Sequence, residues 1–207
     1  MKLLSFVSFI KGLAQNKRYM LAATALFIAG IAMGAIWADE LQRLLLSQLE
    51  GLQSAVQSLE QSDHVELSFF TFIFFNNAIK AVLVMLFGAF FGLAPFGFLL
   101  LNGMVLGFVV EAARRQGQDM AELIFQGLLP HGIIELPAIV IACAYGLKFG
   151  GLVVGSLFSL GNSEKRDQLA LRWETAMKQM LGAAVWVVIL LFVAAIIEST
   201  LTYHLLR

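Results

Sequence analysis

One apolar stretch constrains the fold of this chain more than any other feature. Residues 67–110 contain a single charged side chain, Lys80. A helix that crosses a membrane needs about 20 apolar residues, so this stretch is about twice the length of one span. It predicts two spans joined by a turn near residues 93–95.

The rest of the chain adds three further candidate spans. Hydrophobic residues make up 59% of the 207 residues and charged residues only 14%, whereas roughly a quarter of a soluble domain is charged. Residues 19–38 and 181–203 predict one span each. Residues 123–161 predict either one long span or a re-entrant piece followed by a span. The expected fold class is therefore all-α, a polytopic transmembrane helix bundle of about five spans, and it forms a single integral membrane domain over residues 1–207.

The distribution of Lys and Arg predicts the orientation, because these residues collect in cytoplasmic loops. With the N-terminus inside, eight of them are cytoplasmic and four are outside. We therefore expect a multi-pass protein of the cell (inner or cytoplasmic) membrane, surrounded by the lipid bilayer, with a cytoplasmic N-terminus. The cytoplasmic set is Lys2, Lys11, Lys17, Arg18, Lys165, Arg166, Arg172 and Lys178, and the outer set is Arg43, Arg114, Arg115 and Arg207.

Three segments outside the spans have helical patterns. Residues 1–18 and 161–180 are basic and amphipathic, which suits helices that lie in an anionic membrane surface. Residues 39–68 carry apolar side chains at spacings of three and four, which predicts an extracytoplasmic helix with a narrow apolar seam. That seam either lies on the protein's own outer face or contacts a second copy or a partner protein.

Small residues four apart recur along the spans. Such pairs let the backbones of two helices approach closely. Their number predicts a tight bundle and a homo-oligomer. The pairs are Gly30/Gly34, Gly88/Gly92, Gly103/Gly107, Gly146/Gly150 and Gly151/Gly155.

The motifs of several common enzyme classes are not found in the sequence. It contains no HExxH, no phosphate-binding P-loop and no GxSxG, the local patterns of zinc proteases, nucleotide hydrolases and serine hydrolases. The single cysteine, Cys143, excludes an intrachain disulfide and a cysteine-based zinc cluster. Fourteen Lys and Arg balance fourteen Asp and Glu, so the net charge does not favour nucleic acid. We expect no enzymatic activity, no cofactor and no metal site.

Polar side chains within the spans are the candidates for function. Ionisable and amide groups at membrane depth are costly, so they face protein or water. Their positions predict one polar pocket in the outer half of the bilayer. The set is Asn76, Asn77, Lys80, Asn102, His131, Glu135 and Glu198.

His131 and Glu135 form the sharpest pair in this set. They are four residues apart and therefore share one face of a helix. Pro137 follows closely, and a proline inside a helix removes a hydrogen bond and favours a kink. A broken helix beside a carboxylate is typical of transporter sites. Alternatively, the polar groups hold helices together, and Lys80 either extends to the membrane surface or pairs with a carboxylate.

These residues resemble the stage II sporulation protein M (SpoIIM-like) family. The resemblance is carried by the segment Pro-His-Gly-Ile-Ile-Glu-Leu-Pro-Ala at 130–138, by Phe-Asn-Asn at 75–77, by Asn-Gly at 102–103 and by Ile-Glu at 197–198. It implies a five-span integral membrane protein without assigned enzymatic activity. It also implies envelope protein partners, because the sporulation member works in a complex with peptidoglycan-degrading proteins.

Two functions remain open from the sequence. The first is transport or conduction, without ATP hydrolysis, of a small ion, proton or headgroup that binds at the intramembrane polar site. The second is a non-catalytic scaffold that assembles envelope or cell-wall remodelling partners. Glu135→Gln separates them, because an amide still forms hydrogen bonds between helices but does not carry a proton or a cation charge.

Overall fold

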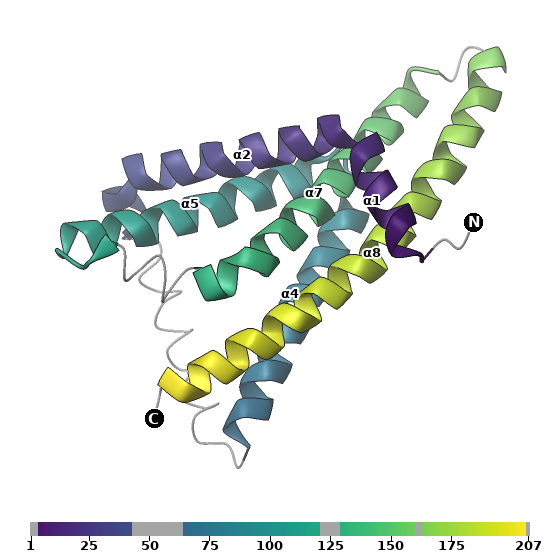
Figure 1. Ribbon diagram of the computed structural model, residues 1–207. Coiled ribbons are helices and arrows are strands. Elements are labelled where there is room, and N and C mark those ends of the chain that lie inside the picture. The colour runs from purple at the N-terminus through teal and green to yellow at the C-terminus, as the bar shows by residue number, and fades with distance from the viewer. Residues whose placement is uncertain (1–3, 43–63, 121–128, 160–162, 206–207) are drawn as a thin grey trace.

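The computed structural model describes residues 4–42, 64–120, 129–159 and 163–205 (Figure 1). Within these ranges, five helices are long and apolar enough to cross a membrane. The predicted all-α polytopic bundle is therefore confirmed. The main helices are α1 (Phe6–Gln15), α2 (Lys17–Ile36), α4 (Val65–Phe87), α5 (Leu93–Arg115), α7 (Leu129–Leu157) and α8 (Ser163–Leu205).

Helix α7 is the centre of the bundle. It contacts α2, α4, α5 and α8, and Figure 1 shows it between the α2–α5 pair and the α4–α8 pair. Ala138, Ala142, Cys143 and Ala144 in its middle section are fully buried. These small side chains let the neighbouring helices pack close to the α7 backbone.

Glycines hold α2 and α5 side by side, running in the same direction. A Cβ atom on Gly30 would lie 2.6 Å from a backbone oxygen of α5, and one on Gly34 would overlap the backbone of Met104. On the other helix, Gly103 and Gly107 face the α2 backbone in the same way. The two glycine pairs therefore allow direct contact of one backbone with the other.

A second set of glycines joins the turn between α4 and α5 to α7. A Cβ atom on Gly88 would overlap the backbone of Gly146, and one on Gly150 would overlap the backbone of Gly92. Gly92 has a φ of 78°, which glycine adopts without a steric penalty. The chain therefore turns just before the predicted position at residues 93–95.

These contacts change what the glycine pairs imply. Four of the five pairs are occupied by contacts within the chain. In the fifth pair, Gly151 faces the hydroxyl of Tyr19 and Gly155 has open space around its Cβ position. The pairs therefore explain the tight bundle and no longer argue for an oligomer, and the homo-oligomer stays a prediction.

Helix α7 answers the question that the sequence left open for residues 123–161. The described part is one continuous helix that passes through Pro137. The side chain of Pro137 is exposed, so its ring does not disturb the packed faces of the helix. The structure therefore favours one long span over a re-entrant piece, although the two ends of the predicted segment lie outside the described residues.

Helix α8 joins two segments that the sequence separated. The predicted inner segment 161–180 and the last span form one helix from residue 163 onward. Figure 1 shows that this helix changes direction near its middle, beside α1. Trp173 donates a hydrogen bond to Ser156 of α7 at 2.8 Å and packs edge-on against Phe149. Trp173, on the apolar face of the inner segment, therefore packs against α7 of the same chain, and the position of this segment relative to the membrane surface stays a prediction.

Helix α1 packs across α8 near this bend. Phe9 is buried and stacks on Trp186, with ring centroids 5.7 Å apart. Val7 and Ile10 of α1, and Leu4 just before it, remain exposed. The interfacial helix expected for 1–18 stays a prediction. The predicted outer helix at 39–68 lies mostly outside the described residues.

Candidate functional site

The asparagines of the predicted site bond locally. Asn76 and Asn77 of α4 are half-buried, and the amide group of Asn76 donates to the oxygen of Asn77 at 3.4 Å. Asn102 of α5 is half-buried and donates to the carbonyl oxygen of Phe98, one turn earlier, at 2.7 Å. These bonds satisfy amide protons within each asparagine's own helix.

Lys80 lies on the outer side of α4. Its side chain is exposed, as are those of Ile79 and Leu83, whereas Ala78 and Ala81 are buried on the opposite side. The ion pairs between described residues do not include Lys80. This position favours the alternative in which the long side chain extends to the membrane surface.

Glu135 and Glu198 lie on α7 and α8, which pack against each other. Both side chains are half-buried, and both take part in interactions within the protein. The Oε2 atom of Glu198 is itself buried. A carboxylate in a membrane span is costly unless protein or water surrounds it, and the burial of both residues is consistent with that requirement.

The depths of these groups follow from the helix contacts. Lys148 of α7 contacts Gln179 of α8, and the two helices run in opposite directions (Figure 1). Glu135 is 13 residues from Lys148, and Glu198 is 19 residues from Gln179. Counted along both helices, this register places Glu198 six residues beyond the level of Glu135, roughly 9 Å along the axis. The glycine contacts between α5 and α7 similarly place Asn102 within about 8 Å of the level of Glu135.

The described residues therefore support neighbouring depths for the two carboxylates and Asn102. The convergence of all seven side chains in one pocket stays a prediction. The side chain of His131 lies outside the description, so the His131–Glu135 pair is untested.

A polar network that sequence reasoning did not find lies at the other end of the bundle. Gln179 of α8 accepts hydrogen bonds from Lys148 at 2.6 Å and from Asn16 at 3.0 Å. Its amide nitrogen donates to Gln15 at 2.6 Å. Asn16, the residue between α1 and α2, is buried and also donates to the carbonyl oxygen of Gly12 at 2.7 Å. The network ties three separate segments together.

The sequence offered one signal for this network. Lys148 is an isolated cation in an apolar stretch, and such residues mark polar surroundings. Gln15, Asn16 and Gln179 lie in segments that resemble ordinary surface helices. Only the packing of α1 against α7 and α8 brings them together.

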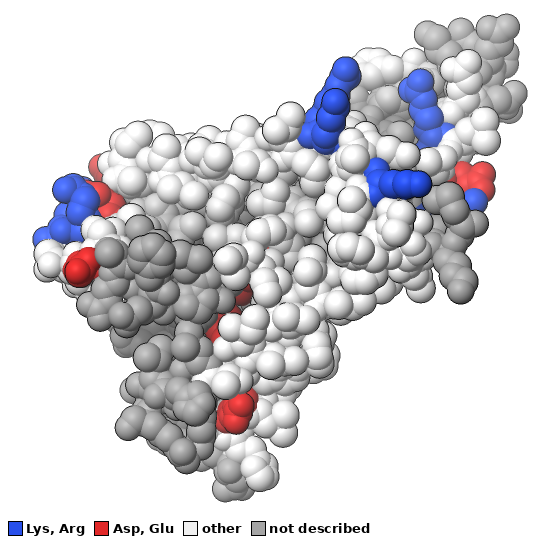
Figure 2. Space-filling model, in the orientation of Figure 1, with Lys and Arg blue, Asp and Glu red and all other residues white. Residues whose placement is uncertain are grey.

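Basic side chains gather at the same end, called here the basic end. Figure 2 shows blue side chains over α1 and the adjoining parts of α2 and α8, with few charges over the middle of this face. At the opposite end, Arg114 and Arg115 pair with Glu111, and Arg115 also pairs with Asp39. The described basic residues of the basic end are Lys11, Lys17, Arg18, Lys148, Arg172 and Lys178.

The structure shows no metal centre among the residues that it describes. No group of three or more His, Cys, Asp and Glu side chains there could hold a metal ion. The chemistry available at the described sites is therefore that of carboxylates, amides and ammonium groups.

The fold and these sites define a multi-pass all-α membrane protein with polar groups buried between its spans. The chain belongs to the stage II sporulation protein M (SpoIIM) family, whose family model matches residues 23–203. This match confirms the family resemblance predicted from the sequence.

Two similar proteins come from the archaeon Methanocaldococcus jannaschii. The uncharacterized protein MJ0706 is 32% identical over 42% of this chain and 38% of its own length. The uncharacterized protein MJ0793 is 31% identical over 61% of this chain and 67% of its own length. The chain thus spans less than half of the first relative and about two thirds of the second. No solved structure matches this chain.

Proposed function

We propose that this chain is a transport or conduction protein that moves a small cation or proton through the membrane without hydrolysing ATP. The observation that carries the proposal is the position of Glu135, a half-buried carboxylate on α7, the helix that contacts the four other spanning helices. Glu198 lies on α8, which packs against α7. A carboxylate at membrane depth is costly unless it faces protein or water, and such residues commonly mark the pathways of ions and protons.

The central position of α7 is what links binding to movement in this proposal. A change in the charge of Glu135 alters the electrostatic energy at an interface shared by several helices. Such a change can shift the balance between two arrangements of the bundle, provided that they bind the ion differently. The α2–α5 pair is locked by its glycines, so α4 and α8 are the helices expected to shift against α7.

The test uses purified protein in vesicles that carry a pH-sensitive or a sodium-sensitive dye. A potassium gradient with valinomycin sets the membrane potential. Wild-type protein is expected to pass protons or sodium faster than protein-free vesicles, and Glu135→Gln is expected to lower that flux at least tenfold. Glu198→Gln is expected to lower the same flux, and Glu40→Gln, which changes an exposed carboxylate in the same way, is the matched control.

Two outcomes of that experiment contradict transport. In the first, wild-type protein moves neither ion above the protein-free rate. In the second, both Gln variants keep the wild-type flux. The yield of monodisperse protein is measured for each variant, so that loss of flux is separated from loss of the fold.

A scaffold that assembles envelope partners is the second candidate. The local hydrogen bonds of Asn76 and Asn102 weigh against the binding of a transported ion by these amides, because they already have partners within their own helices. If the chain is a scaffold, the wild-type protein moves no protons or sodium ions. Glu135→Gln then either lowers the folded yield or has no effect. Co-purification of envelope proteins with the wild-type chain from its own membrane would support this candidate.

A further inference from the structure

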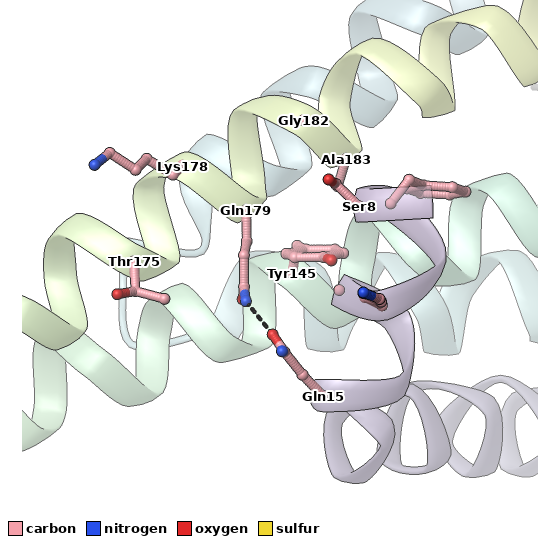
Figure 3. A pocket seen from close by; sticks show the side chains of 11 residues that line it. Ser8, Gln15, Tyr145, Thr175, Lys178, Gln179, Gly182 and Ala183 are labelled. Carbon is pink, nitrogen blue, oxygen red and sulfur yellow. Dashed lines mark hydrogen bonds between the residues drawn. The ribbon is translucent and has the colours of Figure 1, made fainter. Parts of the chain in front are cut away.

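Two hollows lie at the basic end, and the hydrogen-bonded pair Gln15 and Gln179 lines both of them. The first has a volume of about 290 Å³ and the second about 410 Å³. Both are near the lower limit of about 300 Å³ for small-molecule pockets. Gln15, Thr175 and Gln179 line both of them, and Figure 3 shows Gln179 of α8 reaching toward Gln15 of α1. The hollows are therefore large enough for a small polar group.

The first hollow is the weaker candidate for an anion. Its cations are Lys11 and Lys178. Lys178 already forms an ion pair with Glu174 at 2.5 Å, and Figure 3 shows its side chain pointing away from Gln15 and Tyr145. The charge of Lys178 is therefore largely neutralised.

The second hollow, called here the Lys148 groove, is lined by two cations and no carboxylate. Lys148 and Arg172 contribute the positive charge, and Thr175 adds a hydroxyl group. The ion pairs between described residues include neither Lys148 nor Arg172. Lys148 is half-buried and has the amide oxygen of Gln179 as a neutral partner.

This arrangement leaves positive charge without a counter-charge among the described residues. An ammonium group has three donors, and one hydrogen bond to Gln179 leaves two of them for a ligand. Burial of a cation is costly unless an opposite charge is near. An anion in the Lys148 groove would supply that charge, and guanidinium and ammonium groups bind phosphate oxygens strongly.

The surroundings of the groove are amphiphilic. Leu152 and Leu171 form apolar walls, and Leu171 is 66% exposed. Basic pockets between membrane helices on the cytoplasmic side bind anionic lipid headgroups. From the groove and its unneutralised cations, we infer that the Lys148 groove binds a phosphate-bearing anion, with Lys148 and Arg172 holding the phosphate oxygens. The inference is independent of the proposed transport role of Glu135.

Such an anion can be a phospholipid headgroup or free phosphate, and the experiment separates these sources. The full chain is prepared in phosphatidylcholine nanodiscs, and binding of fluorescent phosphatidylglycerol is titrated. Inorganic phosphate is added in a second arm as competitor. Wild-type protein is expected to bind phosphatidylglycerol in a saturable way, and both Lys148→Gln and Arg172→Gln are expected to weaken that binding at least fivefold.

The variants are chosen so that misfolding does not imitate a loss of binding. Lys148→Gln removes a member of the network, whereas Arg172 is exposed and its replacement leaves the packed interior unchanged. Arg18→Gln, which removes an exposed cation of the basic end that lines neither hollow, is the matched control and is expected to bind like wild type.

Each result has a defined meaning. If millimolar phosphate displaces phosphatidylglycerol, a free anion is identified as an occupant. If the lipid stays bound in phosphate, the lipid headgroup is identified as the occupant. Either result supports the inference. The inference is overturned if wild-type protein shows no saturable binding and no phosphate-dependent stabilisation. It is also overturned if Arg172→Gln binds as tightly as wild type, or if Arg18→Gln weakens binding equally.

Discussion

Gly34 and Gly97 lie in spanning helices but have different surroundings. A Cβ atom on Gly34 would overlap the backbone of α5, whereas one on Gly97 would meet nothing within 4 Å. Gly34→Ala is therefore expected to force α2 and α5 apart and to destabilise the protein by about 1–3 kcal/mol. Gly97→Ala, the same chemical change, is expected to be neutral or stabilising by up to about 1 kcal/mol.

Thermal unfolding in one detergent checks this pair of variants. The melting temperature of Gly34→Ala is expected to fall clearly, and that of Gly97→Ala to stay equal or rise. Equal melting temperatures for the two variants would mean that close backbone contact does not hold α2 and α5 together.

At the scale of single residues, the sequence predicted which polar side chains are costly in lipid better than it predicted which residues they contact. The cost of polar groups in lipid was enough to select Glu135 and Glu198, and both are half-buried in the bundle. The same rule selected Lys80, yet its side chain is exposed because it lies on the outer side of α4. Gln179 was not selected, since a glutamine in a basic helix gives no signal until another helix packs against it.

At the scale of elements, α1 is held on α8 by two aromatic contacts, because Phe6 and Phe9 both pack against Trp186. Of the two, only Phe9 is buried. Phe9 is 7% exposed and stacks on Trp186. Truncation of a buried Phe to Ala commonly costs about 3–5 kcal/mol, which is large for a helix of ten residues. Phe9→Ala is therefore expected to release α1 while the spanning helices stay folded.

Hydrogen exchange of the α1 amides measures this release. Exchange is expected to be at least tenfold faster in Phe9→Ala than in wild type. Val7→Ala, at a position that is 61% exposed on the same helix, is expected to exchange like wild type. Equal protection in both variants would show that the Phe6–Trp186 contact and the hydrogen bonds of Asn16 and Gln15 hold α1 without Phe9.

The helices also show which structural features sequence patterns predict and which they do not. Span-length apolar runs located the five spanning helices, because the thickness of the bilayer fixes their length. The predicted inner segment 161–180 and the predicted span 181–203 are parts of one helix from residue 163, because a change in polarity along a helix does not interrupt its backbone hydrogen bonds. The helix α7 continues through Pro137, and the kink expected there stays a prediction.

At the scale of the whole molecule, the charges are segregated between the two ends of the bundle. Apart from Lys80, the described basic residues without acidic partners lie at the basic end, and Arg114 and Arg115 at the opposite end are paired with Glu111. A cytoplasmic basic end agrees with the positive-inside rule and stays a prediction. The arrangement of the helices around α7 could not be predicted from the sequence, because apolar helix faces that contact lipid and apolar helix faces that contact protein have the same composition.

The proposed function requires that solvent or a transported ion reaches Glu135 on the central helix. A membrane-permeant carbodiimide, which reacts with protonated carboxyl groups, measures this at the residue itself. Folded protein in vesicles is labelled at several pH values, and the modified peptides are identified by mass spectrometry. Glu135→Gln is the control for assignment of the site.

The expected result is modification of Glu135 in the folded protein, decreasing as the pH rises and decreasing when the transported cation is added. The contrary result is a Glu135 that stays unmodified at every pH in the folded protein and reacts only after denaturation. That result would mean that the carboxylate is sealed between helices and serves to hold them together.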